Sequence, residues 1–204
     1  MPSPINVPNF LTALRLVLSV VLFVVLAIAQ NVTGTGATEG GTPARHLYLA
    51  GLGLFVVAAG TDWLDGYWAR RYGQVTMLGR IFDPFVDKII VCGTFIFLAA
   101  AWPRSGVAAW MAVLIVGREL LVTALRSFLE QRGTDFSASL SGKLKMLIQC
   151  VAVCASLYAL SRPAVPSPPA WLAWTVTGLV WAAIVITVYS GLGYLRRAAV
   201  LLRE

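Results

Sequence analysis

The sequence is short of charge, of cysteine and of histidine. Only 12% of its 204 residues are charged, and nine acidic residues stand against sixteen lysines and arginines. The mean hydropathy of +0.79 and the hydrophobic content of 58% lie far outside the range of ordinary soluble domains. This composition excludes a soluble globular enzyme and predicts a protein whose solvent is the lipid bilayer.

The three cysteines and the one histidine do not suggest a metal site. Cys150 and Cys154 share a helical face, but no third ligand lies near them in the sequence. We interpret them, together with Cys92, as small buried hydrophobic residues. His46 lies at the outer start of an apolar run and is interpreted as an interfacial residue.

Long apolar runs fill most of the chain. Six segments approach the ~20 residues that a helix needs to cross a bilayer. They are residues 10–30, 47–70, 81–101, 107–128, 143–161 and 171–194. We therefore predict an all-α integral membrane protein with six transmembrane helices. Residues 1–204 would form a single membrane-embedded catalytic domain, with a short interfacial segment at 1–10.

The basic residues of the connecting segments predict an orientation. Arg45, Arg104 and Arg162 fall on one side of the predicted spans. The other side carries Arg70, Arg71, Arg80, Arg132, Lys143, Lys145, Arg196, Arg197 and Arg203. The positive-inside rule then puts both termini in the cytoplasm, as expected for the inner (cytoplasmic) membrane. The net charge of +7 suits anionic lipids or substrates, whereas such dispersed basic residues disfavour nucleic acid.

Four of the nine acidic residues lie within one short window, at Asp62, Asp65, Asp83 and Asp87. Ionised carboxylates at membrane depth are costly, and they persist mainly where they bind ions, relay protons or line a wet cavity. We therefore predict that this window is the functional centre.

Helical spacing groups these aspartates with small residues. One stripe along a helix consists of Asp62, Asp65, Gly66 and Ala69, and Arg70 lies beside it. A second stripe, on the returning span, consists of Gly79, Asp83 and Asp87. Small residues let a neighbouring helix or the phosphates of a ligand approach the backbone closely. Simple helix packing would also explain the small residues, and an N-cap followed by proline would explain Asp83 alone.

Clustered carboxylates repel one another unless cations neutralise them, and hard oxygen ligands suit Mg²⁺ or Mn²⁺. Two metals about 4 Å apart can clamp a phosphoryl centre during in-line displacement. Carboxylates, small residues and an arginine together indicate a pyrophosphate substrate.

The string D-x-x-D-G-x-x-A-R-x8-G-x-x-x-D-x-x-x-D, which runs from Asp62 to Asp87, resembles the signature of the CDP-alcohol phosphatidyltransferases. These integral membrane enzymes join two alcohols through a phosphate. The resemblance implies a six-helix fold, usually homodimeric, with a site open to the cytoplasm and the lipid. It also implies two divalent cations bound by Asp62, Asp65, Asp83 and Asp87, with Asp87 as the general base.

Segments outside the signature resemble one branch of the family. Residues 6–15, 117–126 and 142–149 are similar to bacterial phosphatidylglycerophosphate synthases. The chain departs from that pattern in bulkier residues at Phe85 and Val86 and in a long loop over 31–44.

A second group of charges suggests how an acceptor is held. Arg118 and Arg126 are two helical turns apart, and Lys143 and Lys145 begin the next span near the same boundary. Arginine suits a phosphate dianion, and Glu119 would orient one of these cations by pairing. The alternative is that both lysines only anchor the helix at the membrane surface.

The resemblance to this family, together with the basic residues, implies transfer of a phosphatidyl group from CDP-diacylglycerol to glycerol 3-phosphate. CDP-diacylglycerol would be bound by Asp62, Gly66, Ala69, Arg70 and Gly79, and glycerol 3-phosphate by Arg118, Arg126, Lys143 and Lys145. A phosphatidylinositol-phosphate synthase and a cardiolipin synthase are the alternatives within the family. A cation transporter is the alternative outside it.

Overall fold

The computed structural model describes residues 7–34, 42–72, 77–131, 140–163 and 169–201. Within its helices, the side chains of residues 62–72, 77–84, 87 and 143 are among those outside the described part. In the described residues all regular secondary structure is helical, which confirms the predicted fold class.

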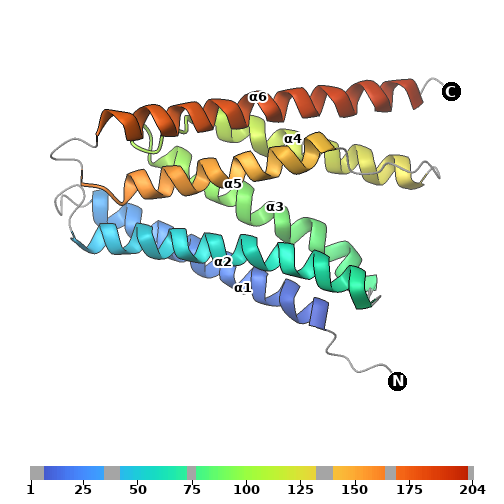
Figure 1. Cartoon of the computed structure of the whole chain (residues 1–204), viewed down its shortest axis with the longest axis horizontal. Coiled ribbons are helices and arrows are strands. Elements are labelled where there is room, and N and C mark those ends of the chain that lie inside the picture. The colour runs from blue at the N-terminus through green and yellow to red at the C-terminus, as the bar shows by residue number, and fades with distance from the viewer. Residues whose placement is uncertain (1–6, 35–41, 73–76, 132–139, 164–168, 202–204) are drawn as a thin grey trace.

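In the described part of the chain, six helices alternate in direction along the long axis of the molecule (Figure 1). They are α1 (Val7–Gly34), α2 (Thr42–Tyr72), α3 (Met77–Ala100), α4 (Ala109–Gln131), α5 (Leu140–Leu160) and α6 (Ala170–Leu201). Helix α1 packs along α2, and α5 packs along α6. Helix α3 crosses between these two pairs and contacts α1, α4 and α5.

Three helices of the described part are long and apolar enough to cross a membrane, over Thr12–Thr33, Pro43–Thr61 and Ala170–Arg196. Two further apolar stretches, Lys88–Ala100 and Leu144–Leu160, are shorter. The chain is therefore a membrane protein, while the prediction that all six helices span the bilayer stays a prediction.

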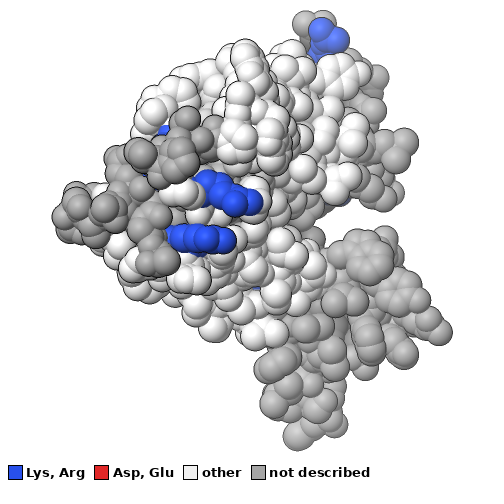
Figure 2. Space-filling model, turned by 60° about the vertical axis from the view of Figure 1, so that its left-hand side comes forward, with Lys and Arg blue, Asp and Glu red and all other residues white. Residues whose placement is uncertain are grey.

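Large apolar side chains lie both on the surface and between the helices, as expected for a protein whose solvent is the bilayer. Val113 and Trp174 are 71% and 77% exposed, whereas Phe55, Phe95 and Leu157 are fully buried between helices. Figure 2 shows one face on which the described residues are mainly uncharged, with a few lysine and arginine side chains among them.

Glycine allows α1 and α3 to approach closely. A Cβ atom added at Gly93 would lie 2.3 Å from Cζ of Phe23, whose ring stacks on Phe97 with centroids 5.5 Å apart. This contact packs α3 against α1 at a position that follows Asp87 along α3.

The alternation of the helices brings the predicted site residues to one end of the molecule. The end of α2, the start of α3, the end of α4, the start of α5 and the end of α6 all lie there (Figure 1). The acidic signature and the predicted acceptor residues are thus carried by the same half of the bundle.

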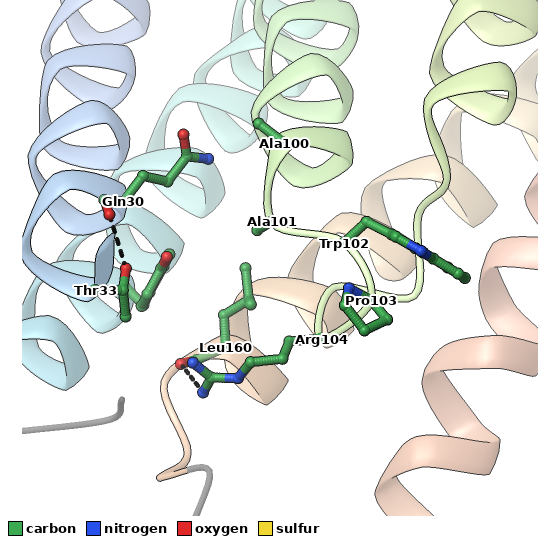
Figure 3. A pocket seen from close by; sticks show the side chains of 9 residues that line it. Gln30, Thr33, Ala100, Ala101, Trp102, Pro103, Arg104 and Leu160 are labelled. Atoms are coloured by element: carbon green, nitrogen blue, oxygen red, sulfur yellow. Dashed lines mark hydrogen bonds between the residues drawn. The ribbon is translucent and has the colours of Figure 1, made fainter. Parts of the chain in front are cut away.

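The opposite end contains a cavity of about 470 Å³ between α1, α2, α5 and the segment after α3 (Figure 3). Polar side chains that line this cavity donate hydrogen bonds to backbone carbonyl oxygens near the ends of helices. Arg104 donates from Nη2 to the carbonyl oxygens of Leu160 and Arg162, at 3.3 and 2.7 Å, and Gln30 donates from Nε2 to that of Phe97 at 2.7 Å. We infer that Arg104 and Gln30 stabilise the end of the bundle that contains this cavity.

Candidate functional site

The acidic signature lies on two helices that run in opposite directions. Asp62 and Asp65 belong to α2, and Asp83 and Asp87 belong to α3. Their spacings, i to i+3 and i to i+4, put the members of each pair on one face of a helix. The aspartate side chains lie outside the described part, so their convergence remains a prediction. The same holds for Gly66, Ala69, Arg70 and Gly79.

The start of α3 removes one simpler explanation of Asp83. An N-cap would require the helix to begin at Asp83, whereas α3 begins at Met77 and contains both Asp83 and Pro84. The N-cap interpretation is therefore wrong, and capping does not account for this carboxylate.

The donor set fits divalent cations by its chemistry. Four carboxylates supply hard oxygen ligands of the kind that Mg²⁺ and Mn²⁺ prefer. Among the described side chains no group of three or more His, Cys, Asp and Glu residues exists, but those side chains do not include the four aspartates.

A basic cluster joins α3, α4 and α5; we define it as Lys88, Arg118 and Lys145 together with Glu119. Oε1 of Glu119 accepts a hydrogen bond from Nη1 of Arg118 at 3.0 Å and another from Nζ of Lys145. Lys88 donates from Nζ to Oγ1 of Thr123, whose hydroxyl donates in turn to the carbonyl oxygen of Glu119 at 2.7 Å. One carboxylate and one hydroxyl therefore connect cations from three helices.

Helix α6 completes the surroundings of Arg118. Nη2 of Arg118 donates to Oγ of Ser190 at 2.7 Å, and the guanidinium lies 5.6 Å from the ring centroid of Tyr194. A Cβ atom at Gly191 would lie 3.1 Å from Cγ of Arg118. A serine, a glycine and an aromatic ring thus hold one arginine against α6.

The basic cluster holds three cations and one carboxylate, and its side chains other than the half-buried Lys88 are almost fully buried. The side chains of Arg118, Lys145 and Glu119 are 10%, 8% and 10% exposed. Arg118 and Lys145 share the carboxylate of Glu119, whereas Lys88 donates to Thr123. Within the described part, the buried Nε of Arg118 has no hydrogen-bond partner. Buried charge is stable only when it is paired, so this arrangement favours a bound anion.

The sequence analysis found part of this cluster. Arg118 and Lys145, which the sequence analysis named, both bond to Glu119, which was expected to pair with one of these cations. Their role in binding an acceptor stays a prediction. Arg126 is half-buried further along α4, within electrostatic reach of Lys88, while the side chain of Lys143 lies outside the described part. The interpretation of Lys145 as a surface anchor is wrong, because its side chain is buried and paired.

The sequence analysis missed Lys88, Thr123, Ser190, Gly191 and Tyr194. Lys88 directly follows Asp87 and begins an apolar run. A lysine in that position could have been recognised from the sequence as a candidate site residue. Thr123 and Ser190 gave no such signal, because single hydroxyl residues are common in membrane helices.

The chain matches known proteins over almost its full length. Residues 5–189 match the family described as CDP-alcohol phosphatidyltransferase, and the chain belongs to this family. It is 35% identical over 190 residues to a Bacillus subtilis protein named CDP-diacylglycerol--glycerol-3-phosphate 3-phosphatidyltransferase, which covers 93% of each chain. A protein of the same name from Escherichia coli K12 is 32% identical over 195 residues, covering 95% of this chain and 94% of that one.

Proposed function

We propose that the chain transfers the phosphatidyl group of CDP-diacylglycerol to sn-glycerol 3-phosphate, giving phosphatidylglycerophosphate and CMP. Family membership supports the reaction type, and the names of the two relatives support this pair of substrates. The observation that carries the choice of acceptor is the buried basic cluster, because a free-alcohol acceptor would leave its positive charge without a counterpart.

The acidic signature is the proposed donor site. Asp62, Asp65, Asp83 and Asp87 would hold two divalent cations, Mg²⁺ or Mn²⁺. When bound, these cations would supply positive charge that stabilises the growing charge on the phosphoryl oxygens. In addition to Asp62, the residues around CDP-diacylglycerol would be Gly66, Ala69, Arg70 and Gly79.

Asp87 is the proposed general base. Its carboxylate would take the proton of the acceptor's 1-hydroxyl group as the hydroxyl oxygen forms a bond to the phosphorus that carries diacylglycerol. The bond from that phosphorus to the bridging oxygen breaks, and the electron pair leaves on CMP. Arg70 would hold the pyrophosphate oxygens during this displacement.

The basic cluster is the proposed acceptor site. Arg118 and Lys145 would bind the phosphate of glycerol 3-phosphate, with Lys88 adding a third positive charge and with Arg126 and Lys143 at the boundary. Lys88 is the residue after Asp87 on α3, so a single helix would carry both the base and part of the acceptor site.

The proposed setting is the inner membrane. The chain would form a homodimer there, with both termini and the site facing the cytoplasm. The bias of basic residues toward one side of the spans supports this orientation.

CMP release by the purified protein tests this function. We expect release from CDP-diacylglycerol with Mg²⁺ or Mn²⁺ and glycerol 3-phosphate, and its loss on chelation. Asp87→Asn should lower turnover by about 10³-fold, because it removes the base. Tryptophan fluorescence on heating should show that this variant is folded.

Acceptor competition separates the alternatives. Release only with inositol phosphate or phosphatidylglycerol would retain the chemistry and contradict the acceptor. A folded wild-type protein that releases no CMP with any acceptor would contradict the whole proposal.

A further inference from the structure

We propose that Ser190 and Gly191 of α6 form a seat that positions Arg118 to bind the phosphate of the acceptor. This inference rests on the proposed function, since it concerns how the acceptor site is built. The matched family region ends at residue 189, so both residues lie just beyond it.

Arg118 is held from two sides. Glu119, its neighbour on α4, accepts from Nη1 at 3.0 Å, and Ser190 on α6 accepts from Nη2 at 2.7 Å. Because the guanidinium is planar, two bonds to different nitrogens fix the plane of the group as well as its position. Ser190 thereby sets the direction in which the remaining donors of Arg118 face.

Gly191 makes room for the stem of the same side chain. An added Cβ atom would lie 3.1 Å from Cγ and 3.7 Å from Nε of Arg118. The first of these distances is tighter than ordinary van der Waals contact, so an added methyl group would require the stem of Arg118 to shift by a few tenths of an ångström. Gly193, two residues further along, has nothing within 4 Å of the same added atom.

The seat serves binding rather than the packing of two helices. Within the described part, the Nε of Arg118 is buried and has no hydrogen-bond partner, although Ser190 and Glu119 occupy the other two nitrogens. Among the described side chains, Arg118 and Lys145 share the carboxylate of Glu119, and Lys88 donates to the hydroxyl group of Thr123. A phosphate dianion that approaches Arg118 and Lys145 would balance the excess charge, and it needs the guanidinium to be held in one orientation.

The test compares Ser190→Ala, Ser190→Thr, Gly191→Ala and Gly193→Ala in the full-length protein in detergent. Ser190→Ala removes the hydrogen bond and Ser190→Thr keeps the hydroxyl. Gly191→Ala and Gly193→Ala raise helix propensity alike, but only the first meets Arg118. Each variant is measured for its KM for each substrate, for its Tm, and for the shift in Tm caused by glycerol 3-phosphate or by inorganic phosphate.

We expect Ser190→Ala and Gly191→Ala to raise the KM for glycerol 3-phosphate about tenfold, since each weakens a bond to a charged group. The KM for CDP-diacylglycerol should stay unchanged, and the stabilisation by inorganic phosphate should fall in parallel. For Ser190→Thr, both the KM for glycerol 3-phosphate and the stabilisation by phosphate should be close to those of the wild type. For Gly193→Ala, both should equal the wild-type values.

The seat is contradicted if Ser190→Ala leaves both the KM for glycerol 3-phosphate and the stabilisation by phosphate unchanged. It is also contradicted if all four variants change the KM of both substrates together, which a general packing defect would cause. If Gly191→Ala does not fold, the comparison of Ser190→Ala with Ser190→Thr tests the seat by itself. The phosphate readout needs no turnover, so an inactive wild type contradicts the function while the thermal shifts still decide the seat.

Discussion

At the scale of single residues, the proposed site has an acidic group and a basic group of side chains that share helix α3. The acidic signature belongs to α2 and α3, and the basic cluster belongs to α3, α4 and α5. Residues 87 and 88 of α3 are the point at which the two sets meet. A donor with bound cations and an anionic acceptor would each find charge of the opposite sign along this helix.

Glu119 is the residue on which the basic cluster depends most. We predict that Glu119→Ala lowers the free energy of unfolding by about 3 kcal/mol, because it leaves Arg118 and Lys145 buried without their shared partner. Thermal unfolding followed by tryptophan fluorescence checks this. Glu119→Gln should be milder, since its amide oxygen still accepts a hydrogen bond. Equal stability of Glu119→Ala and the wild type would show that the cluster does not hold these helices together.

The sequence predicted some of these residues and not others for a physical reason. The four aspartates stand out because carboxylates are rare in apolar runs and their spacing matches a helical face. Arg118 and Lys145 stand out in the same way. Ser190 and Gly191 do not, because their role depends on which helix lies opposite α4, and the spacing of residues within one helix holds no information on that.

At the scale of elements, hydropathy predicted the helices better than their ends. The predicted third span begins at residue 81 and the fourth ends at 128, whereas α3 begins at Met77 and α4 ends at Gln131. A helix continues beyond the bilayer wherever its backbone stays hydrogen-bonded, so apolar length sets a lower bound on helix length. This extension carries Asp83 into the interior of α3.

The contact between α1 and α3 gives a prediction for a single glycine. Gly93→Ala should destabilise the protein by about 2 kcal/mol, because the added methyl group overlaps the ring of Phe23. The matched control is Gly53→Ala on α2, where nothing lies within 4 Å of the added atom. Thermal unfolding of both variants checks this. A Tm for Gly93→Ala at or above that of Gly53→Ala would contradict the close packing of α1 and α3.

At the scale of the whole molecule, the alternating helices of the described part bring residues that are far apart in the sequence into contact. Residues as far apart as Arg118 and Ser190 bond directly because α4 and α6 pack together and carry them at matching depths. The sequence predicted that the acidic signature and the basic residues share one side of the membrane. Which helices lie side by side depends on packing between apolar surfaces, and hydropathy does not specify it.

The orientation of the molecule has a direct test. We predict that a fluorescent protein fused to the C-terminus is fluorescent in bacterial cells and that alkaline phosphatase fused there is inactive, because the basic segments hold this end in the cytoplasm. A fusion after residue 163, between α5 and α6, should give the opposite result. Active phosphatase at the C-terminus would reverse the proposed orientation.

The most direct test of the central claim is to follow labelled glycerol 3-phosphate into lipid. Purified protein with CDP-diacylglycerol and Mg²⁺ or Mn²⁺ should move the label into the organic phase as phosphatidylglycerophosphate, with one CMP released for each label transferred. Asp87→Asn should lower both signals together, by about 10³-fold. Release of CMP without transfer of label to lipid would contradict glycerol 3-phosphate as the acceptor and, with it, the role given to the basic cluster.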